Sequence, residues 1–153
     1  MKYHYHSPIG WLELVISNQV LTAIRYLDNK PDPLQTPKHS VFEQAANQLT
    51  RYFNKKDKHF TMPISTQGTA FQKTVWEELQ NIPFGTTITY GELAKRLGDP
   101  NKVRAVGRAN GKNPIPIIIP CHRVIGSDKK LIGYAGGIER KRFLLEHEGA
   151  ILL

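Results

Sequence analysis

The 153-residue sequence has little cysteine and no long apolar segment. Its single cysteine, Cys121, excludes an internal disulfide and a zinc site built from several cysteines, and it fits a reducing cytoplasm. The isoleucine run 117–119 lies between two prolines, and no segment reaches the roughly 20 apolar residues of a transmembrane helix. The first residues also lack the apolar core of a signal peptide. These features predict a soluble intracellular monomer.

Acidic side chains are also scarce, because 13 Asp and Glu residues stand against 21 Lys and Arg residues, for a formal net charge of +8. The excess is uneven, since nine basic and two acidic residues between Lys95 and Lys130 give this segment a net charge of +7. Such clustering favours a polyanionic partner, above all nucleic acid. The overall charge alone is equally well explained by solubility, and only its clustering favours nucleic acid.

The first third of the chain has the pattern of an antiparallel sheet followed by a helix. Apolar and β-branched residues gather in three segments that are separated by short turns. The expected strands cover residues 2–6, 11–16 and 20–27. Ser40 and Glu43 have the spacing of a capping box, which predicts a helix from Ser40, as its N-cap, to about Asn54. This region predicts a small α/β unit and contains no catalytic motif.

The following segments predict helices with clear start and stop signals. A second capping box, Thr69–Gln72, begins one helix, and a third predicts a short helix over Tyr90–Leu97. Gly98 ends that short helix, and Asp99 caps another that we expect to run to about Asn110. Two short helices joined by a tight turn are typical of a helix-turn-helix, although many helical hairpins bind nothing.

The second helix of this pair combines basic residues with very small ones. Gly107 lies in its middle and costs about 1 kcal/mol relative to alanine, which is tolerated where another backbone must approach closely. Small side chains with arginine fit a helix that enters a nucleic-acid groove. Long polar side chains that would read base edges are missing from it. We therefore expect binding that depends on shape and only weakly on sequence.

Residues 115–124 form the segment that carries the reactive side chains. Prolines alternate with isoleucines up to Cys121, which predicts a rigid, buried, extended stretch. A lone cysteine is usually a buried structural thiol. Here His122 and Arg123 follow it directly, and their positive charge is expected to lower the pKa of the thiol and activate it as a nucleophile.

The segment around Cys121 resembles a family signature. Its sequence, Pro120-Cys121-His122-Arg123-Val124, is similar to that of the O6-alkylguanine-DNA alkyltransferases, also called methylated-DNA–protein-cysteine methyltransferases. Further motifs at the spacing of this family are Arg104-Ala105-Val106-Gly107, Asn113-Pro114, Pro116, Tyr134 with Gly136-Gly137, His147-Glu148-Gly149 and, near the start, Ser7-Pro8-Ile9-Gly10. The strong resemblance covers Phe71 to about Ala150, roughly half of the chain. The combination is highly specific, whereas a Cys-His pair alone would not be.

The resemblance implies a fold in two parts. Residues 1–66 would form an α/β unit that resembles ribonuclease H and has an antiparallel sheet. Residues 67–153 would form a mainly helical domain that carries the helix-turn-helix and the active-site cysteine. The resemblance thus extends the α/β unit and the helical pair expected from the residue patterns.

The resemblance also implies a reaction. The substrate of the family is a guanine alkylated on O6 and flipped out of duplex DNA. Cys121 would attack the alkyl carbon and keep the group as a thioether, so each molecule would act once. A hydrogen-bonded chain from Cys121 through a water and His122 to Glu148 would take the thiol proton. Tyr90 would donate a proton to the departing guanine and help to rotate the base.

Contacts to DNA and to the base are implied in the same way. Arg104 matches the arginine that fills the gap in the base stack, on a helix that enters the minor groove. The other implied DNA-binding residues are Ala105, Gly107, Arg108 and Tyr90. The implied pocket residues are Asn113, Val124, Tyr134 and Ala135, of which Asn113 would tie the recognition helix to the active-site segment.

Two positions depart from some relatives. Ala135 stands where some carry serine, which removes a side-chain hydrogen bond to the base. Arg108 stands where some carry glycine, which adds a phosphate contact or crowds the groove.

The zinc site of some animal relatives cannot be assembled with one cysteine, so we expect no metal and no cofactor. The expected partner is double-stranded DNA containing O6-alkylguanine, with cooperative binding left open.

Two other functions remain as alternatives. A damage-binding protein without enzymatic activity, like the alkyltransferase-like proteins, would place tryptophan where this chain has Cys121. A cysteine hydrolase would use Cys121, His122 and Glu148, but no oxyanion-hole motif is evident. We expect location in a prokaryotic cytoplasm, or in the nucleus of a eukaryote. The sequence leaves open the preference for methyl or bulkier groups and the activity on O4-alkylthymine.

Overall fold

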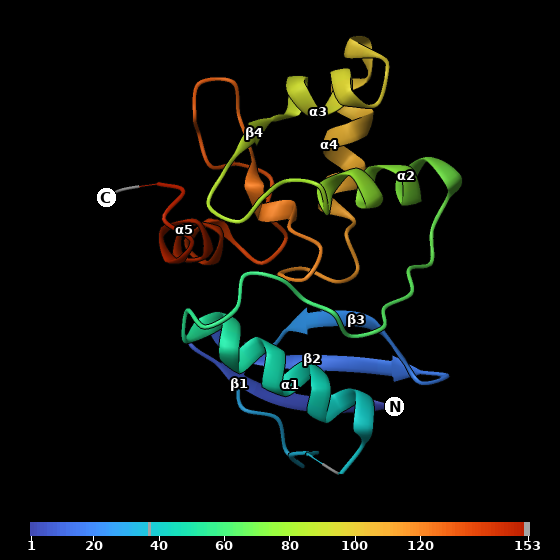
Figure 1. The fold of residues 1–153 in the computed structure, drawn as a ribbon, viewed down its shortest axis with the longest axis vertical. Helices are drawn as coiled ribbons and strands as arrows, with labels where there is room; N and C mark the ends of the chain where they lie inside the picture. Colours follow the sequence, from blue (N-terminus) through green and yellow to red (C-terminus); the bar gives the residue numbers. More distant parts are fainter. Residues whose placement is uncertain (37, 152–153) are drawn as a thin grey trace. The chain divides into compact units, whose positions relative to one another are not determined.

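The computed structural model describes residues 1–36 and 38–151 and divides the chain into two compact units (Figure 1). The first unit is Met1–Gln67 and the second is Gly68–Leu153, whereas the sequence placed the boundary after residue 66. In the described part of the chain, no helix is both long and apolar enough to cross a bilayer.

The N-terminal unit is an antiparallel sheet covered by one helix, as predicted. The strands pair in sequence order and are β1 (Lys2–Ser7), β2 (Gly10–Ser17) and β3 (Val20–Tyr26). Leu12, Leu14 and Ile16 of β2 are buried, because alternate residues of a strand face the same side. Helix α1 (Ser40–Phe53) crosses the sheet in Figure 1 and packs against all three strands.

The start of α1 differs from the prediction by one residue. Ser40 is the first helical residue, and His39 is the N-cap, with its Nδ1 accepting a hydrogen bond from Val41 N at 3.2 Å. His39 has the extended backbone that an N-cap needs, and an imidazole nitrogen accepts the N–H as a serine oxygen would. The prediction of Ser40 as N-cap is therefore wrong, while the predicted helix is present.

The C-terminal unit is mainly helical. Its helices and strands are α2 (Ala70–Leu79), β4 (Ile88–Thr89), α3 (Tyr90–Arg96), α4 (Val103–Gly111), β5 (Val124–Ile125) and α5 (Ile138–His147), with 3₁₀ turns at Pro100–Lys102 and Cys121–Arg123. Strands β4 and β5 pair in parallel, with Ile88 opposite Val124. Because α3 begins directly after β4 and the Cys121 turn directly precedes β5, this pairing brings Tyr90 to the cysteine segment.

The predicted helix-turn-helix is formed by α3 and α4. Gly98 has a φ of +91°, which lets the chain leave α3. The Asp99 side chain then accepts a hydrogen bond from Asn101 N at 2.9 Å, and Pro100 begins the turn that leads into α4. These local signals thus determine where α3 ends and where the turn into α4 begins.

Helix α4 is held against both α2 and α3 (Figure 1). Trp76 of α2 is buried and donates its indole N–H to Ala109 O at 2.8 Å. Val106 and Ala109 are buried, whereas Arg104 and Arg108 remain exposed. The packing therefore presents the basic face of α4 to solvent.

The segment before Cys121 is buried as predicted, but it is not extended. Ile119 N donates to Ile115 O at 2.9 Å, and Ile117 has a φ of +74°, so the chain makes a compact turn. The Asn113 side chain holds this turn, donating to Ile119 O at 2.7 Å and accepting from Ile115 N at 3.0 Å. These bonds close the turn in place of the predicted extended stretch, and the prolines lack the N–H groups with which that stretch could pair as a strand.

Candidate active site and nucleic-acid interface

Cys121 is buried, with 6% of its surface exposed, and begins the 3₁₀ turn that precedes β5. Its backbone N–H donates to Ile119 O at 2.8 Å, so the turn held by Asn113 also sets the position of the thiol. Burial raises the pKa of the Cys121 thiol to about 11, although a hydrogen bond from Asn113 and the charge of Lys141 act in the opposite direction. The thiol is therefore protonated at neutral pH, and the predicted lowering of its pKa is wrong.

Arg123 does not act on the thiol because its charge is already paired. Its Nε and Nη2 donate to Glu148 Oε1 and Oε2 at 2.8 and 3.0 Å, and its Nη1 donates to Ile82 O at 2.7 Å. Both side chains are buried. This two-point ion pair fixes the orientation of the Glu148 carboxylate.

His122 is fully buried and shares the same carboxylate. Its Nε2 lies 2.8 Å from Glu148 Oε2. Although burial by itself raises the pKa of Glu148, His122 and Arg123 hold that pKa well below its usual range. An ionised carboxylate can only accept, so Nε2 carries the hydrogen of this bond.

His122 therefore exposes its other ring nitrogen as an acceptor. Burial lowers the pKa of His122 below its ordinary value and outweighs the Glu148 hydrogen bond, which raises it. In the neutral ring with a hydrogen on Nε2, Nδ1 is a base. That Nδ1 is buried and has no hydrogen-bond partner among residues 1–36 and 38–151. The residue that follows Cys121 in the sequence thus carries a buried proton acceptor that is unoccupied in the described part of the chain.

Glu148 occupies a position that would be unfavourable without Arg123. It is the C-cap of α5, followed by Gly149 with a φ of +72°, and it is buried. A carboxylate at a helix C-terminus is opposed by the helix dipole. The paired guanidinium offsets both the dipole and the loss of water around the carboxylate.

Tyr90 lies between α4 and the loop that follows β5. Its hydroxyl donates to Ile132 O at 3.1 Å, and a Cβ added to Gly107 of α4 would lie 3.8 Å from its ring. Burial, and then the charge of Cys121, raise the pKa of Tyr90, against a hydrogen bond from Asn110 that lowers it. Gly133 has a φ of +71° and would place a Cβ 2.9 Å from the hydroxyl, so only glycine fits there. The phenol is therefore protonated and close to Cys121.

Lys141 is a buried residue of this site that the sequence did not reveal. Its Nζ donates to Val124 O at 2.6 Å and to Ile132 O at 2.7 Å, which joins β5 to the loop that carries Tyr134 and Ala135. Burial lowers the pKa of Lys141 to about 8. It lies among charged residues of α5, a pattern typical of a solvated helix face, so no sequence signal distinguishes it.

Asn110 is the other residue that the sequence analysis missed. It lies near the end of α4, is 2% exposed, and donates from Nδ2 to Cys121 O at 3.4 Å. A polar residue at the end of a predicted helix usually faces solvent, which is why it was not selected. The structure therefore links α4 to the cysteine through both Asn110 and Asn113.

The predicted pocket residues differ in their surroundings. Val124 is fully buried beside the cysteine turn and Tyr134 is also buried, whereas Ala135 is exposed at the next position. Gly137 N donates to Tyr134 O at 3.0 Å, which closes a turn at this point of the loop. The Lys141 bonds bring Val124 and this loop together. Asn113 instead holds the turn before Cys121, through Ile119 O and Ile115 N.

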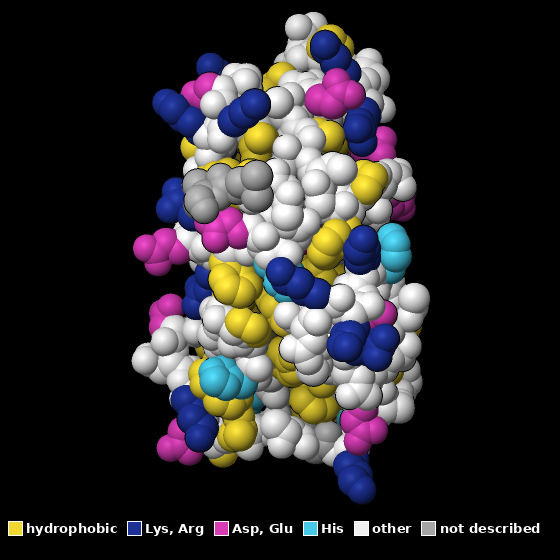
Figure 2. Space-filling model, turned by 60° about the vertical axis from the view of Figure 1, so that its left-hand side comes forward, with side chains coloured by type: hydrophobic (Ala, Val, Ile, Leu, Met, Phe, Trp, Pro, Cys, Tyr) yellow, Lys and Arg dark blue, Asp and Glu magenta, His cyan; other side chains and the backbone are white. Residues whose placement is uncertain are grey.

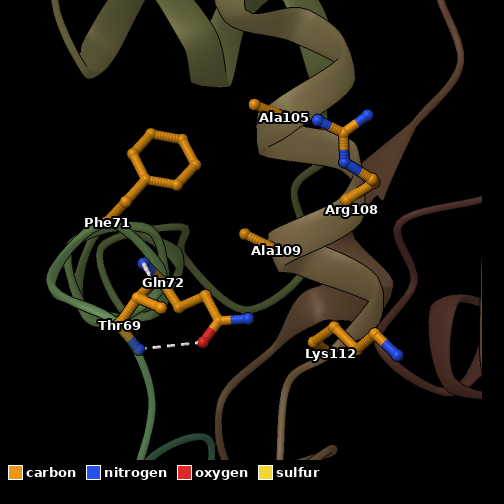
Figure 3. A pocket seen from close by; sticks show the side chains of 7 residues that line it. All are labelled: Thr69, Phe71, Gln72, Ala105, Arg108, Ala109 and Lys112. Carbon is orange, nitrogen blue, oxygen red and sulfur yellow. Dashed lines mark hydrogen bonds between the residues drawn. The ribbon is translucent and has the colours of Figure 1, made fainter.

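The predicted DNA-binding residues fall on two sides of α4. Gly107 faces Tyr90, whereas Ala105 and Arg108 line a pocket of about 280 Å³ between α4 and α2. Figure 3 shows Ala105 and Ala109 on the side of α4 that faces α2, with Ala105 pointing toward Phe71, and Arg108 and Lys112 extending away from α2. Cys121 does not line this pocket, which is therefore separate from the reactive thiol. The exposed residues Arg108 and Lys112 line it instead.

On one face of the molecule, the basic side chains are dispersed. On the face drawn in Figure 2, Lys and Arg side chains stand singly or in small groups among hydrophobic and uncharged atoms. In contrast, Arg104 and Arg108 are exposed one helical turn apart on α4. The local arrangement on α4 therefore says more about binding than the net charge does.

Two family profiles match this chain in succession. The ribonuclease-like domain of 6-O-methylguanine DNA methyltransferase matches residues 1–66, and the DNA binding domain of 6-O-methylguanine DNA methyltransferase matches residues 70–150. Together they account for nearly the whole sequence and for the α/β and helical parts of the fold.

Curated relatives are similar over nearly the whole chain. A methylated-DNA–protein-cysteine methyltransferase of Mycobacterium tuberculosis is 48% identical over 151 residues, covering 95% of this chain and 92% of the relative. One of Methanosarcina acetivorans is 44% identical, covering 95% and 96%.

Solved structures share the fold. Mycobacterium tuberculosis OGT in complex with DNA has a TM-score of 0.87 at 47% identity, over 97% of this chain and 92% of that chain. An O6-methylguanine DNA methyltransferase from Methanococcus jannaschii has a TM-score of 0.70 at 28% identity, over 100% and 95%.

Proposed function

Because this chain belongs to the 6-O-methylguanine DNA methyltransferase family, we propose that it repairs DNA by moving an alkyl group from O6 of guanine to its own Cys121. The observation that carries the proposal is the buried cluster in which Arg123 fixes Glu148, Glu148 holds His122, and His122 Nδ1 is left as an acceptor next to the cysteine. Such a nucleophile, base and orienting group form the usual arrangement for activating a thiol.

The cluster supplies the proton transfer that the reaction needs. The thiol proton passes through a water to His122 Nδ1 as the sulfur attacks the alkyl carbon in line. The carbon–sulfur bond forms as the carbon–O6 bond breaks, and guanine leaves as an anion. The Tyr90 hydroxyl donates a proton to that anion, and the proton held by His122 is returned through solvent to the phenolate. A thioether is a poor leaving group, so each molecule acts once.

The raised pKa of Cys121 is consistent with this sequence of events. A thiol that is protonated at rest needs a base during attack, and neutral His122 provides one. The charge of Lys141 favours the thiolate as it forms, and Asn113 donates a hydrogen bond to it. The resting protein thus keeps an unreactive thiol until the proton can leave.

Binding of the duplex uses the exposed face of α4. We place α4 in the minor groove, with Arg104 in the space of the extruded nucleotide. Ala105 and Gly107 are half-buried beside this face and add no bulk that would hold the duplex away. Arg108 takes a phosphate at the rim of the α2–α4 pocket. The structure of the Mycobacterium tuberculosis relative with DNA supports this partner. The protein works as a monomer where DNA is found, in a prokaryotic cytoplasm or in a eukaryotic nucleus.

The pocket for the flipped base lies between Tyr90 and the loop after β5. Val124 and Tyr134 supply apolar walls, and backbone groups near Ala135 replace the serine hydroxyl of some relatives. Lys141 holds this loop against β5 through two carbonyl groups. No metal or other cofactor takes part in the proposed reaction.

Intact-mass analysis tests the proposal directly. After mixing with duplex DNA that contains O6-methylguanine, the protein should gain one CH₂, and peptide mapping should place it on Cys121. The variant Cys121→Ser should gain nothing and still bind the duplex, because its DNA contacts come from α4. A cysteine hydrolase or a binding protein without activity would leave the wild-type mass unchanged, and transfer that survives in Cys121→Ser would overturn the assignment.

A further inference from the structure

Two buried side-chain atoms in the described part of the chain have no hydrogen-bond partner, and both flank Cys121. They are His122 Nδ1 and Asn110 Oδ1. Residue His122 follows the cysteine, and Asn110 Nδ2 donates to Cys121 O at 3.4 Å. The proposed proton transfer uses His122 Nδ1, but no step uses Asn110 Oδ1. A buried carbonyl oxygen without a donor is unfavourable and calls for a ligand or a water.

The surroundings of Asn110 place this oxygen at the reacting centre. Asn110 follows Gly107 by three residues, so both lie on the face of α4 that meets the Tyr90 ring. Its side chain also forms a hydrogen bond to Tyr90 that favours the phenolate, which identifies its amide nitrogen as the donor. Asn110 therefore lies between the Tyr90 hydroxyl, which protonates the departing guanine in the proposed reaction, and the backbone of Cys121, whose thiol attacks the alkyl carbon.

The orientation of the amide is set by its partners. Cys121 O can only accept, so the atom facing it must be Nδ2. Oδ1 is then the atom left for a ligand, and it requires an N–H or O–H donor. Tyr90 cannot serve as that donor during transfer, because its hydroxyl is used to protonate the departing guanine. The missing donor must therefore come from the substrate or from water.

The alkylated base offers one kind of donor. Alkylation of O6 fixes the guanine ring in a form in which N1 carries no hydrogen, so the exocyclic 2-amine holds the only N–H groups of the base. O4-alkylthymine has no exocyclic amine, and its N3 carries no hydrogen either. Alkylated guanine can therefore satisfy a buried acceptor, whereas alkylated thymine leaves it unpaired, which disfavours thymine.

We propose that Asn110 is a specificity-determining residue whose Oδ1 accepts an N–H of the 2-amine of O6-alkylguanine. This inference rests on the proposed function of Cys121. The base takes the place near Tyr90 as the hydroxyl leaves Ile132 O, and the amine replaces any water on Oδ1. Nδ2 stays on Cys121 O, so the same amide reads the base and positions the backbone of the nucleophile.

Three matched duplexes test this role in single-turnover transfer at saturating protein. They contain O6-methylguanine, O6-methylhypoxanthine, which lacks only the 2-amine, or O4-methylthymine. The wild-type protein should transfer from O6-methylguanine about tenfold faster than from O6-methylhypoxanthine, since one buried hydrogen bond is lost. A wild-type ratio near one would overturn the proposal without any variant.

Two variants separate reading from positioning. Asn110→Leu has a similar size and no acceptor, and should bring the ratio of the two purine rates close to one. The same variant should also reduce the ratio of the transfer rate from O6-methylguanine to that from O4-methylthymine. Asn110→Asp keeps an oxygen acceptor but loses the N–H to Cys121 O, so both purine rates should fall while their ratio is kept.

Each other outcome has a defined meaning. If Asn110→Leu lowers all three rates equally and keeps the ratio, Asn110 only positions Cys121 or binds a buried water, and the proposal is wrong. Should Asn110→Leu fail to fold by circular dichroism, Asn110→Ser, which shortens the side chain, should lower the ratio in the same way. Absence of any transfer by the wild type from O6-methylguanine would instead refute the proposed function.

Discussion

The exposed face of α4 and the buried cluster around Glu148 both depend on arginine, but in different ways. Arg104 and Arg108 project into solvent, where salt screens their charge. Arg123 is buried, and each of its guanidinium nitrogens donates a hydrogen bond to Glu148 or to Ile82 O. In the proposed function, the exposed charge governs how DNA is found and held, whereas the buried charge sets which groups carry protons. Substitutions on the exposed face of α4 should therefore change DNA binding and transfer, whereas substitutions in the buried cluster should change stability and its dependence on pH.

The largest effect is expected when the buried pair is broken. Arg123→Ala leaves the Glu148 carboxylate buried without its guanidinium partner, which should lower the free energy of unfolding by about 3–5 kcal/mol. The control is Arg123→Ala combined with Glu148→Gln, which removes the unpaired charge and should recover part of this loss. Urea unfolding of the two single variants and the double variant measures the coupling. Strictly additive effects would show that Arg123 does not stabilise Glu148.

Arg104 should have the next largest effect, and on rate more than on binding. Extrusion of a base costs a few kcal/mol, and the inserted side chain offsets part of that only in a duplex. Arg104→Ala should slow transfer within the bound duplex at least about tenfold, with little effect on the free modified base. Arg104→Lys should recover little, since an ammonium cannot stack as a planar guanidinium does. If Arg104→Ala transferred the alkyl group at the wild-type rate at saturating protein, Arg104 would be only a phosphate contact.

The buried cluster should also give a moderate dependence of stability on pH. The pKa of His122 is lowered on folding, so between that pKa and about 6.5 the unfolded chain binds a proton that the folded chain does not. The contribution of His122 is complete above about pH 6.5 and is lost as the pH falls through the folded pKa. Urea unfolding between about pH 5 and pH 8 should show this in the wild type and less in His122→Asn. If the free energy of unfolding depended on pH equally in the wild type and in His122→Asn, this role of His122 would be contradicted.

The smallest effects are expected at the rim of the α2–α4 pocket. Arg108→Ala and Lys112→Ala should each weaken duplex binding modestly and reduce the log–log salt slope by about one. Transfer within the bound complex should be unchanged, because neither residue reaches Cys121. Lys56→Ala, an exposed lysine of the N-terminal unit, is the matched control and should leave the slope alone. A salt slope near zero in the wild type would refute binding through phosphates.

The two regions also differed in how well the sequence predicted them. Helix α4, its turn and its exposed arginines follow from local signals such as Gly98 and the Asp99 cap, which act within a few residues. In the N-terminal unit, strand periodicity predicted the sheet for the same reason. Local patterns therefore predicted the elements and the accessible face of α4.

The buried cluster depends on contacts between distant residues, and there the sequence was less informative. His122 and Glu148 are 26 residues apart. His122 was selected as the neighbour of Cys121, but its pairing with Glu148 came only from the family resemblance. The charge of Arg123 was assigned to the thiol because the carboxylate that neutralises it lies 25 residues away. Lys141 and Asn110 look like surface residues in the sequence, and only three-dimensional packing shows that they are buried. Burial and pairing at long range set pKa values, and no local pattern reports them.

The indole of Trp76 gives the molecule a built-in optical reporter. Trp76 is 2% exposed and donates to a carbonyl of α4, whereas Trp11, in the N-terminal unit, is partly exposed and stacks on His6 with ring centroids 4.5 Å apart. The two tryptophans therefore occupy environments of different polarity, so their emission differs in wavelength. Because Trp76 is hydrogen-bonded to Ala109 near the C-terminal end of α4, we expect a small displacement of α4 on a duplex to change the blue part of the emission spectrum. Engagement of DNA can then be timed by fluorescence without attaching a dye near Cys121.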